Sequence, residues 1–334
     1  MLTRTVRSTA DAVRRTPARS ATRTATALLL GFTALAALTT AHAQDREGPV
    51  DPVREHLNLA KDGLALDGYD PVAYFPEGGG EPKKGAKTRT VEYRGATYRF
   101  ANDANRERFR AEPSRFAPAF GGWCAYAMAS DDRVEIDPES FLIEDGSLLV
   151  FFDGFFADTR KSWKKEGPEK LRPKADGFWN SFADEPRHRD TLGYAHADGL
   201  ALGGYDPVAY FEPNEIGAIV PLAGDAKLAV TERGLTYRFA SAANRDAFLR
   251  APSVYEPAFG GWDPLRLIAG EAVAPDPDRF AHTAAGRVVL FAAPADGAAD
   301  PVEAWNADRS ALESKAAAAF AKHVADLEKE QAGR

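Results

Sequence analysis

ALDGYDPVAYF, at residues 65–75, returns as ALGGYDPVAYF at residues 201–211. Two further strings return in the same order, TYRFA at 97–101 and 236–240 and PAFGGW at 118–123 and 257–262. Ordered self-similarity at a nearly constant offset is the mark of a duplicated structural unit. The sequence therefore predicts two tandem copies of one small module.

The first half of each copy has the pattern of a hairpin followed by a helix. Residues 91–93 and 97–100 alternate apolar and polar side chains on either side of a short turn, which is typical of a β-hairpin. Asn102 is a favourable N-cap for a helix that Pro113 would stop, and Ser241 occupies the same position in the second copy.

The second half of each copy adds another hairpin and more helices. In the first copy, residues 141–143 and 148–152 flank a turn, while residues 123–128 have the pattern of a short helix. Two further helical stretches are expected around Trp163 and Trp179. The expected fold class is α+β, with two tandem modules, each a small antiparallel sheet with packed helices, and a C-terminal helix.

The N-terminus has the three parts of a secretory signal. An apolar run at residues 25–38 leads to an A-x-A cleavage site at residues 41–43, which places the mature start at Gln44. The alternative is an uncleaved anchor, but the run is shorter than the roughly 20 residues that a spanning helix needs. The basic residues that precede it are Arg4, Arg7, Arg14, Arg15, Arg19 and Arg23.

The charge balance argues against a nucleic-acid partner. The formal net charge is −7, and because the first 43 residues are basic, the remainder is more acidic still. Such a surface repels polyanions, which bind basic patches. The sequence also has one cysteine, Cys124, so no disulfide forms within the chain. Nothing after the signal is long and apolar enough to predict a membrane span.

The predicted organisation has six parts. They are a signal peptide at 1–43, an N-terminal linker at 44–56, module 1 at 57–184, a linker at 185–192, module 2 at 193–306 and a C-terminal helix at 307–334. Module 1 keeps Cys124, whereas module 2 has no cysteine.

The repeated motifs resemble the YHS domain family. They are more similar to its exported branch, in which many members are single modules and some carry selenocysteine at the position of Cys124. The strings that carry the resemblance are GYDPVAYF at 68–75, the Y-x-G-x-x-Y-x-F pattern at 93–100, NRxxF at 105–109, PxxF at 113–116 and GGWCA at 121–125.

The resemblance implies a soft-metal function, because YHS modules attached to metal transporters and sensors are thought to bind soft metals through three cysteines. This chain departs from that pattern at each of the three positions. The matching residues are Ala73, Ala101 and Asn105 in module 1 and Ala209, Ala240 and Asn244 in module 2.

Cys124 is the one chemically distinctive side chain. It follows two glycines where a helix is expected to begin, and a helix N-terminus stabilises a thiolate. Met128 lies four residues later, so the two sulfurs would share a helix face and suit Cu(I). The alternatives are a buried structural cysteine and a core methionine. A third ligand would come from His56, His188 or His196, which are otherwise expected at the surface.

Other distinctive residues have plainer interpretations. The turn at Asp70-Pro71 is expected to be held by the aspartate, which accepts backbone N–H bonds. Module 2 has Asp263-Pro264 where module 1 has the cysteine, so it cannot share the chemistry of Cys124. A set of aromatic residues is expected to form the core shared by both copies rather than a ligand pocket. They are Tyr69, Tyr74, Tyr93, Tyr98 and Trp123.

The leading hypothesis is a periplasmic or secreted binding protein. Module 1 would hold a soft metal such as copper, or another thiol-reactive ligand, at Cys124, and module 2 would stabilise it or dock a protein partner. One alternative is a redox protein in which Cys124 is oxidised and an external reductant restores it. The other is a structural or interaction protein with an inert cysteine. The sequence has none of the common hydrolase or phosphate-loop motifs, and we favour a protein that is not an enzyme.

Overall fold

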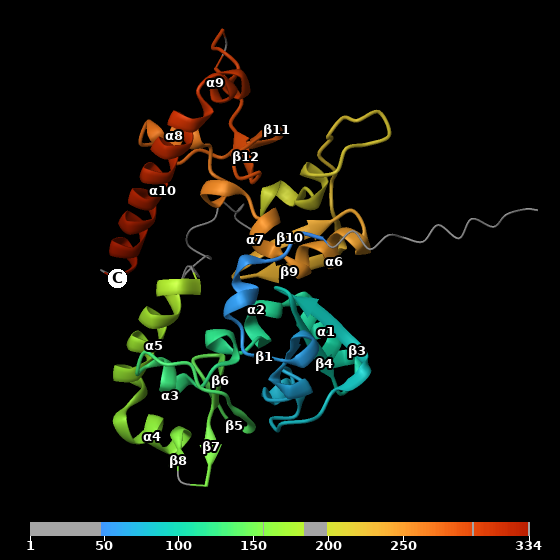
Figure 1. The fold of residues 1–334 in the computed structure, drawn as a ribbon. Helices are drawn as coiled ribbons and strands as arrows, with labels where there is room; N and C mark the ends of the chain where they lie inside the picture. Colours follow the sequence, from blue (N-terminus) through green and yellow to red (C-terminus); the bar gives the residue numbers. More distant parts are fainter. Residues whose placement is uncertain (1–47, 156, 184–198, 296, 333–334) are drawn as a thin grey trace, which may run out of the picture. The chain divides into compact units, whose positions relative to one another are not determined.

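The computed structural model describes residues 48–155, 157–183, 199–295 and 297–332, which belong to one compact unit. The predicted signal peptide and the linker at 185–192 lie outside the described residues. The predicted α+β class is confirmed: short antiparallel hairpins alternate with helices (Figure 1). Across the described ranges, no helix combines the length and the apolar character that crossing a bilayer requires.

The first half of module 1 is a four-stranded sheet with one helix packed beside it. Its elements are β1 (Leu59–Ala60), β2 (Leu64–Ala65), β3 (Ala86–Tyr93), β4 (Ala96–Phe100), α1 (Asp103–Ala111) and α2 (Pro113–Phe116). The strand order is β1-β2-β4-β3, and β3 and β4 form the predicted hairpin. Alternation along both strands buries one face, where the ring of Phe109 from α1 lies 5.8 Å from Tyr93 and 4.8 Å from Tyr98. Asn102 caps α1 as predicted, since its Oδ1 accepts from the backbone N of Asn105 at 2.8 Å.

The second half of module 1 places a hairpin against a group of helices. The elements are α3 (Ala125–Met128), β5 (Asp137–Glu144), β6 (Ser147–Phe151), β7 (Asp153–Gly154), β8 (Ala157–Asp158), α4 (Thr159–Glu166) and α5 (Pro168–Ala183). Trp163 of α4 and Trp179 of α5 are buried in one core with Phe151 of β6. The two helices predicted around these tryptophans are thus confirmed, and they close the core over β6.

Module 2 repeats both halves. Its elements are β9 (Asp225–Glu232), β10 (Leu235–Phe239), α6 (Ala242–Arg250), α7 (Pro252–Tyr255), α8 (Pro264–Ile268), β11 (Asp276–His282), β12 (Val288–Phe291), α9 (Pro301–Ala307) and α10 (Arg309–Ala332). Ser241 caps α6 through its hydroxyl, as Asn102 caps α1. Short 3-10 helices complete both copies. They are η1 (Pro52–His56), η2 (Lys61–Gly63), η3 (Leu66–Gly68), η4 (Pro76–Gly78), η5 (Ala119–Gly122), η7 (Leu202–Gly204), η8 (Val208–Tyr210) and η9 (Ala258–Gly261).

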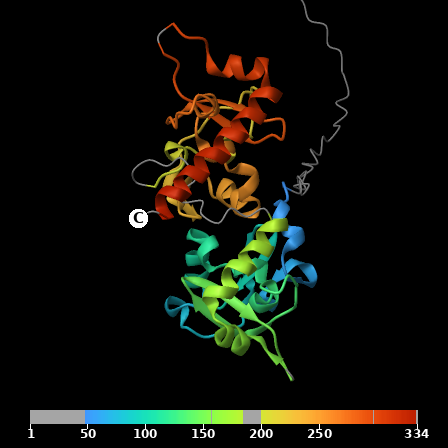
Figure 2. The same ribbon diagram turned by 90° about the vertical axis from the view of Figure 1, so that its left-hand side faces the viewer.

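The C-terminal helix α10 is the counterpart of α5. It packs along α8 as α5 packs along α3 (Figure 2), and each helix buries one alanine completely, Ala316 in α10 and Ala175 in α5. The second copy of the fold therefore continues through α10, beyond residue 306. At the other end, η1 lies in the predicted linker at 44–56, yet its Val53 belongs to the module 1 core.

The two modules pair through equivalent surfaces. Helix α1 contacts β9 while its counterpart α6 contacts β3, so each helix packs on the other copy's hairpin. At this junction the Tyr93 hydroxyl donates to both carboxylate oxygens of buried Glu232, at 2.9 and 3.0 Å. Asp51, just before η1, accepts from the Ser253 hydroxyl of module 2 at 3.0 Å. A reciprocal contact of this kind is the intramolecular equivalent of a two-fold dimer interface.

Replacing Tyr93 tests how much this junction contributes to stability. Tyr93→Phe removes the donor to a buried carboxylate and is expected to lower the free energy of unfolding by about 1.5–3 kcal/mol, the range for hydrogen bonds to charged groups. Tyr98→Phe is the matched control, because the neighbouring Tyr98 hydroxyl has no hydrogen-bond partner among the described residues. Urea unfolding measures both variants. Equal losses would mean that the hydroxyl of Tyr93 contributes nothing specific.

Candidate functional site

Cys124 lies in the core of module 1. Its side chain has no exposed surface, and it occupies the N-cap position of the single-turn helix α3 without making a side-chain capping bond. Its sulfur lies 3.3 Å from the Thr159 hydroxyl, which itself donates to the Phe152 carbonyl at 2.7 Å. Because that hydroxyl has one proton, the thiol is the donor in the first contact. The cysteine thus links α3 to the end of β6 through Thr159.

Met128 shares the same environment. Its backbone N donates to the Cys124 carbonyl at 3.0 Å, which puts the two residues one helical turn apart, as predicted. Its side chain is fully buried and belongs to the core cluster that contains Phe151 and Trp163. The structure therefore brings both sulfur-bearing residues into the interior of module 1.

Among the histidines that the structure describes, His56 does not join this pair as a third ligand. The ring of His56 packs edge-on against Phe182 at 5.3 Å, and its Nε2 lies 3.4 Å from Glu55. His188 and His196 lie outside the described residues. Over the described ranges, no group of three or more His, Cys, Asp or Glu residues is arranged to hold a metal ion.

Asp263 shows what the Cys124 position does in module 2. Its carboxylate accepts from the backbone N of Leu265 and Arg266 at the start of α8, at 2.8 and 3.1 Å. It also accepts from the backbone N of Ala292, just after β12, at 2.7 Å. The aspartate therefore caps the short helix and ties it to the hairpin. In both copies this position joins the same two elements.

The aromatic cluster lies mainly in the core. Burial raises the pKa of Tyr74 and Tyr98 well above the usual value, so both phenols stay neutral. The Tyr74 hydroxyl donates to the Pro138 carbonyl at 2.8 Å. Tyr69 and Trp123 are only partly buried: the Tyr69 hydroxyl donates to Glu139 at 2.8 Å, and Trp123 Nε1 donates to the His56 carbonyl at 2.7 Å.

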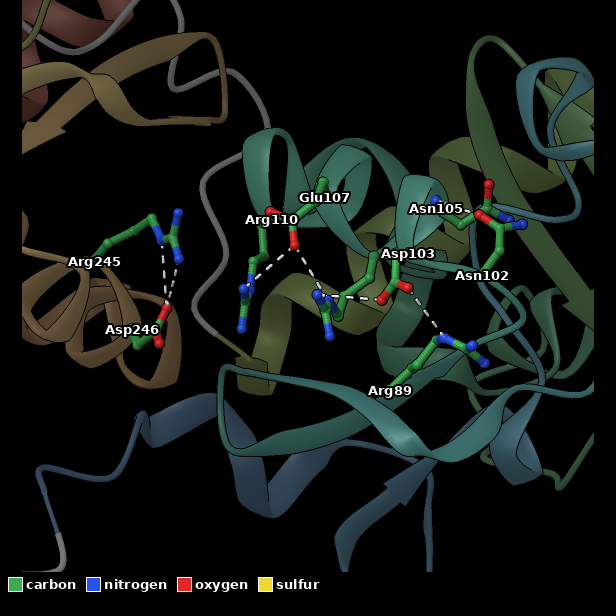
Figure 3. Close-up of polar contacts among 9 residues, drawn as sticks. Arg89, Asn102, Asp103, Asn105, Glu107, Arg110, Arg245 and Asp246 are labelled. Atoms are coloured by element: carbon green, nitrogen blue, oxygen red, sulfur yellow. Dashed lines mark hydrogen bonds and ion pairs between the residues drawn. The ribbon is translucent and has the colours of Figure 1, made fainter.

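A buried aspartate stands among the positions where the resemblance implies cysteines. The Asp70 carboxylate accepts from the backbone N of Val72 at 2.9 Å, from the backbone N of Ala101 at 2.8 Å and from Asn105 Nδ2 at 2.7 Å. Asp206 makes the same three contacts in module 2, at 2.9, 2.8 and 2.7 Å. Figure 3 shows Asn105 beside its cap Asn102 at the start of α1. A hydrogen-bonded carboxylate, rather than a set of thiolates, occupies this part of both modules.

The sequence analysis missed a cavity of about 390 Å³ that both modules line. Module 1 contributes residues from η5, from the turns before β4 and β6, and from α5, and module 2 contributes Arg233. Two of the lining residues, Arg115 and Arg172, differ in kind from Val254 and Glu313, their counterparts in module 2. The signal in the sequence that could have drawn attention to them is this difference between the two copies.

Comparison with protein-family models, with curated proteins and with solved structures finds no match to this chain. The resemblance to YHS domains therefore stays a prediction that rests on the motifs.

The accessibility of Cys124 is testable by alkylation. Because the thiol has no exposed surface, we expect labelling in the folded protein to be about 1,000-fold slower than in urea, limited by local opening of the core. The control is the double variant Cys124→Ala, Ser130→Cys, which carries its thiol at a nearby exposed position and should label at the unfolded rate. Rapid labelling of Cys124 in the native state would contradict the buried placement and favour the reactive-cysteine hypotheses.

The Asp70 network predicts a large loss on substitution. Asp70→Ala leaves three N–H groups, two of them in fully buried hydrogen bonds, without their acceptor and is expected to cost about 3–5 kcal/mol in the free energy of unfolding. Asp206→Ala should cost a similar amount through the same contacts in module 2. Asp67→Asn, at an exposed position of the same segment, is the control and should stay within about 0.5 kcal/mol. Chemical unfolding measures all three, and a small loss for Asp70→Ala would show that the network is dispensable.

Proposed function

We propose that this protein is an exported binding protein in which two YHS-like modules form one body and a small molecule occupies the cavity at their junction. The observation that carries the proposal is the cavity itself. Its volume of about 390 Å³ falls in the range of small-molecule sites, and residues from both modules line it. The proposed export rests on the predicted signal peptide.

The walls of the cavity combine the two features that ligand sites need. Trp179 and Phe120, both buried, provide apolar surface, while Ser114, Ser147 and Asn180 provide hydrogen-bonding groups. In such a site the polar groups orient a ligand, while its apolar part leaves water beside the aromatic side chains. Arg233 lines the same cavity from module 2, so pairing of the modules contributes directly to the site.

A soft metal ion at Cys124 and Met128 is the second candidate, because the two residues lie one helical turn apart in the same core. Burial of the thiol also favours the inert structural role over the redox role, since an oxidant or a protein reductant must reach the sulfur. The alkylation experiment separates these cases when it is repeated with Cu(I). Further protection by the metal would favour the metal site, and no effect of the metal would favour the structural cysteine.

The binding proposal predicts that the protein gains the mass of one bound small molecule. The mature protein is incubated with the low-molecular-mass fraction of the compartment to which it is exported, and native mass spectrometry then weighs it. We expect a species heavier than the chain by one small molecule. The variant Ser147→Trp, which places an indole in the cavity, should lose it because the space is taken. An unchanged mass for the unmodified protein, or an adduct that survives in the folded variant, would contradict the proposal.

A further inference from the structure

The charged groups that line the cavity are mostly positive. Four arginines line it, Arg94, Arg115, Arg172 and Arg233, against one acidic residue, Asp176. Arg115 also forms ion pairs with Glu77 and Glu112, which lie outside the lining. This balance is the reverse of the whole chain, whose formal net charge is −7. A concave site that concentrates one sign of charge attracts ligands of the opposite sign. We propose that the cavity binds a small organic anion, with its phosphate or carboxylate group held by the arginines and its flat apolar part against the aromatic wall. This inference rests on the proposed function, since it names the class of ligand for the same cavity.

Arg172 is the best-positioned donor. Its Nε donates to Asp176 Oδ1 at 3.1 Å, one turn along α5, and its guanidinium lies 5.3 Å from the centre of the Phe120 ring. These two contacts hold the guanidinium plane. Within the part of the chain that the structure describes, Nε is the atom of Arg172 that forms hydrogen bonds, so its terminal NH₂ groups are available to a ligand. Arginine in this state binds carboxylate or phosphate through two parallel hydrogen bonds.

Arg94 and Arg233 form a pair contributed by the two modules. They occupy the same position in the turns after β3 and β9, and their side chains are only 11% and 13% exposed. Each has a carboxylate nearby: Arg94 Nε lies 3.6 Å from Asp51 and Arg233 Nε lies 3.3 Å from Glu232. Neither carboxylate lines the cavity, so each ion pair holds its arginine at the cavity wall and offsets part of its charge from behind.

The aromatic wall explains why a flat ligand fits. Tyr98, Phe120 and Trp179 line the cavity, and all three are buried. Gly121 brings the backbone close to this wall: it has φ of 61°, and a Cβ there would lie 2.6 Å from the Trp179 ring. A planar apolar group placed against this wall is removed from water.

Module 2 shows that the fold does not require this site. Arg287 is the counterpart of Ser147, and its guanidinium donates to the carbonyls of Glu256 and Pro257 at 3.3 and 2.9 Å. In module 1 the residues that match these two, Ala117 and Pro118, line the cavity. The chain's own arginine thus lies across the corresponding region of module 2. The same backbone is therefore compatible with an arginine across this region, as in module 2, and with a cavity there, as in module 1.

The test measures binding of defined anions by isothermal titration calorimetry. The probes are phenyl phosphate, benzoate and inorganic phosphate, with phenol as the neutral analogue. We expect phenyl phosphate or benzoate to bind more tightly than phenol, with an affinity that falls as salt is added. Arg172→Gln should weaken anion binding at least tenfold, as expected for loss of charged hydrogen bonds, without changing phenol binding.

Two variants make the result specific. Ser147→Arg copies the module 2 residue and should abolish binding of every probe, while Arg89→Gln, which removes a partly exposed arginine outside the cavity, should leave binding unchanged. Thermal melting without ligand checks that each variant folds. Binding of one anion alone identifies the preferred head group and supports the inference. Equal affinity for phenol and the anions, or full affinity in folded Arg172→Gln, would overturn it. If none of the anions binds, but native mass spectrometry still shows a bound small molecule that Ser147→Trp removes, the anion class is wrong and the binding function stands.

Discussion

The buried carboxylate of Asp70, with its equivalent Asp206, is the constraint on which each module depends. A carboxylate out of water is costly unless hydrogen bonds replace its hydration, and here three N–H donors do so. The donors come from the turn at Val72, from Ala101 just after β4 and from Asn105 on α1. One side chain therefore fixes how the turn at Asp70-Pro71, the hairpin and the helix meet. The repetition of the same three contacts in module 2, with nearly identical distances, shows that the arrangement is a property of the module and not of one copy.

The same comparison between copies explains the position of Cys124. Asp263 uses three backbone hydrogen bonds to join α8 to the end of β12, and Cys124 makes the corresponding link through Thr159. A thiol is a weaker partner than a carboxylate, but it loses less on burial because it carries no charge. Module 1 can accept a cysteine at this position because the Thr159 hydroxyl completes the link from Cys124 to the Phe152 carbonyl. Cys124, the chemically distinctive residue of the sequence, thus occupies a position that links a short helix to a hairpin in both copies.

Much of the fold was predictable because its signals are local. The β3–β4 hairpin followed from alternation, and the starts of α1 and α6 followed from Asn102 and Ser241, whose caps depend on residues three positions away. The cavity was not predictable in this way, because its arginines come from separate elements and meet only after the modules pair. The equivalence of α10 and α5 was also missed. Few residues match between these helices, and what they share is a buried alanine at the same point of contact.

Because the two modules are parts of one chain, their residues can differ at equivalent positions. In a symmetric dimer of one module, every residue at the junction appears twice, so a charged cavity near the axis would repeat and a closing side chain would close both sites. In a single chain the two sides vary independently. Tyr93 faces Glu232 where a symmetric pair would oppose two identical residues, and Arg287 lies across one side while Ser147 leaves the other open. The paired modules can therefore keep one copy as a support that supplies Arg233, while the other forms the cavity. This division accounts for the differences between two copies that share one fold.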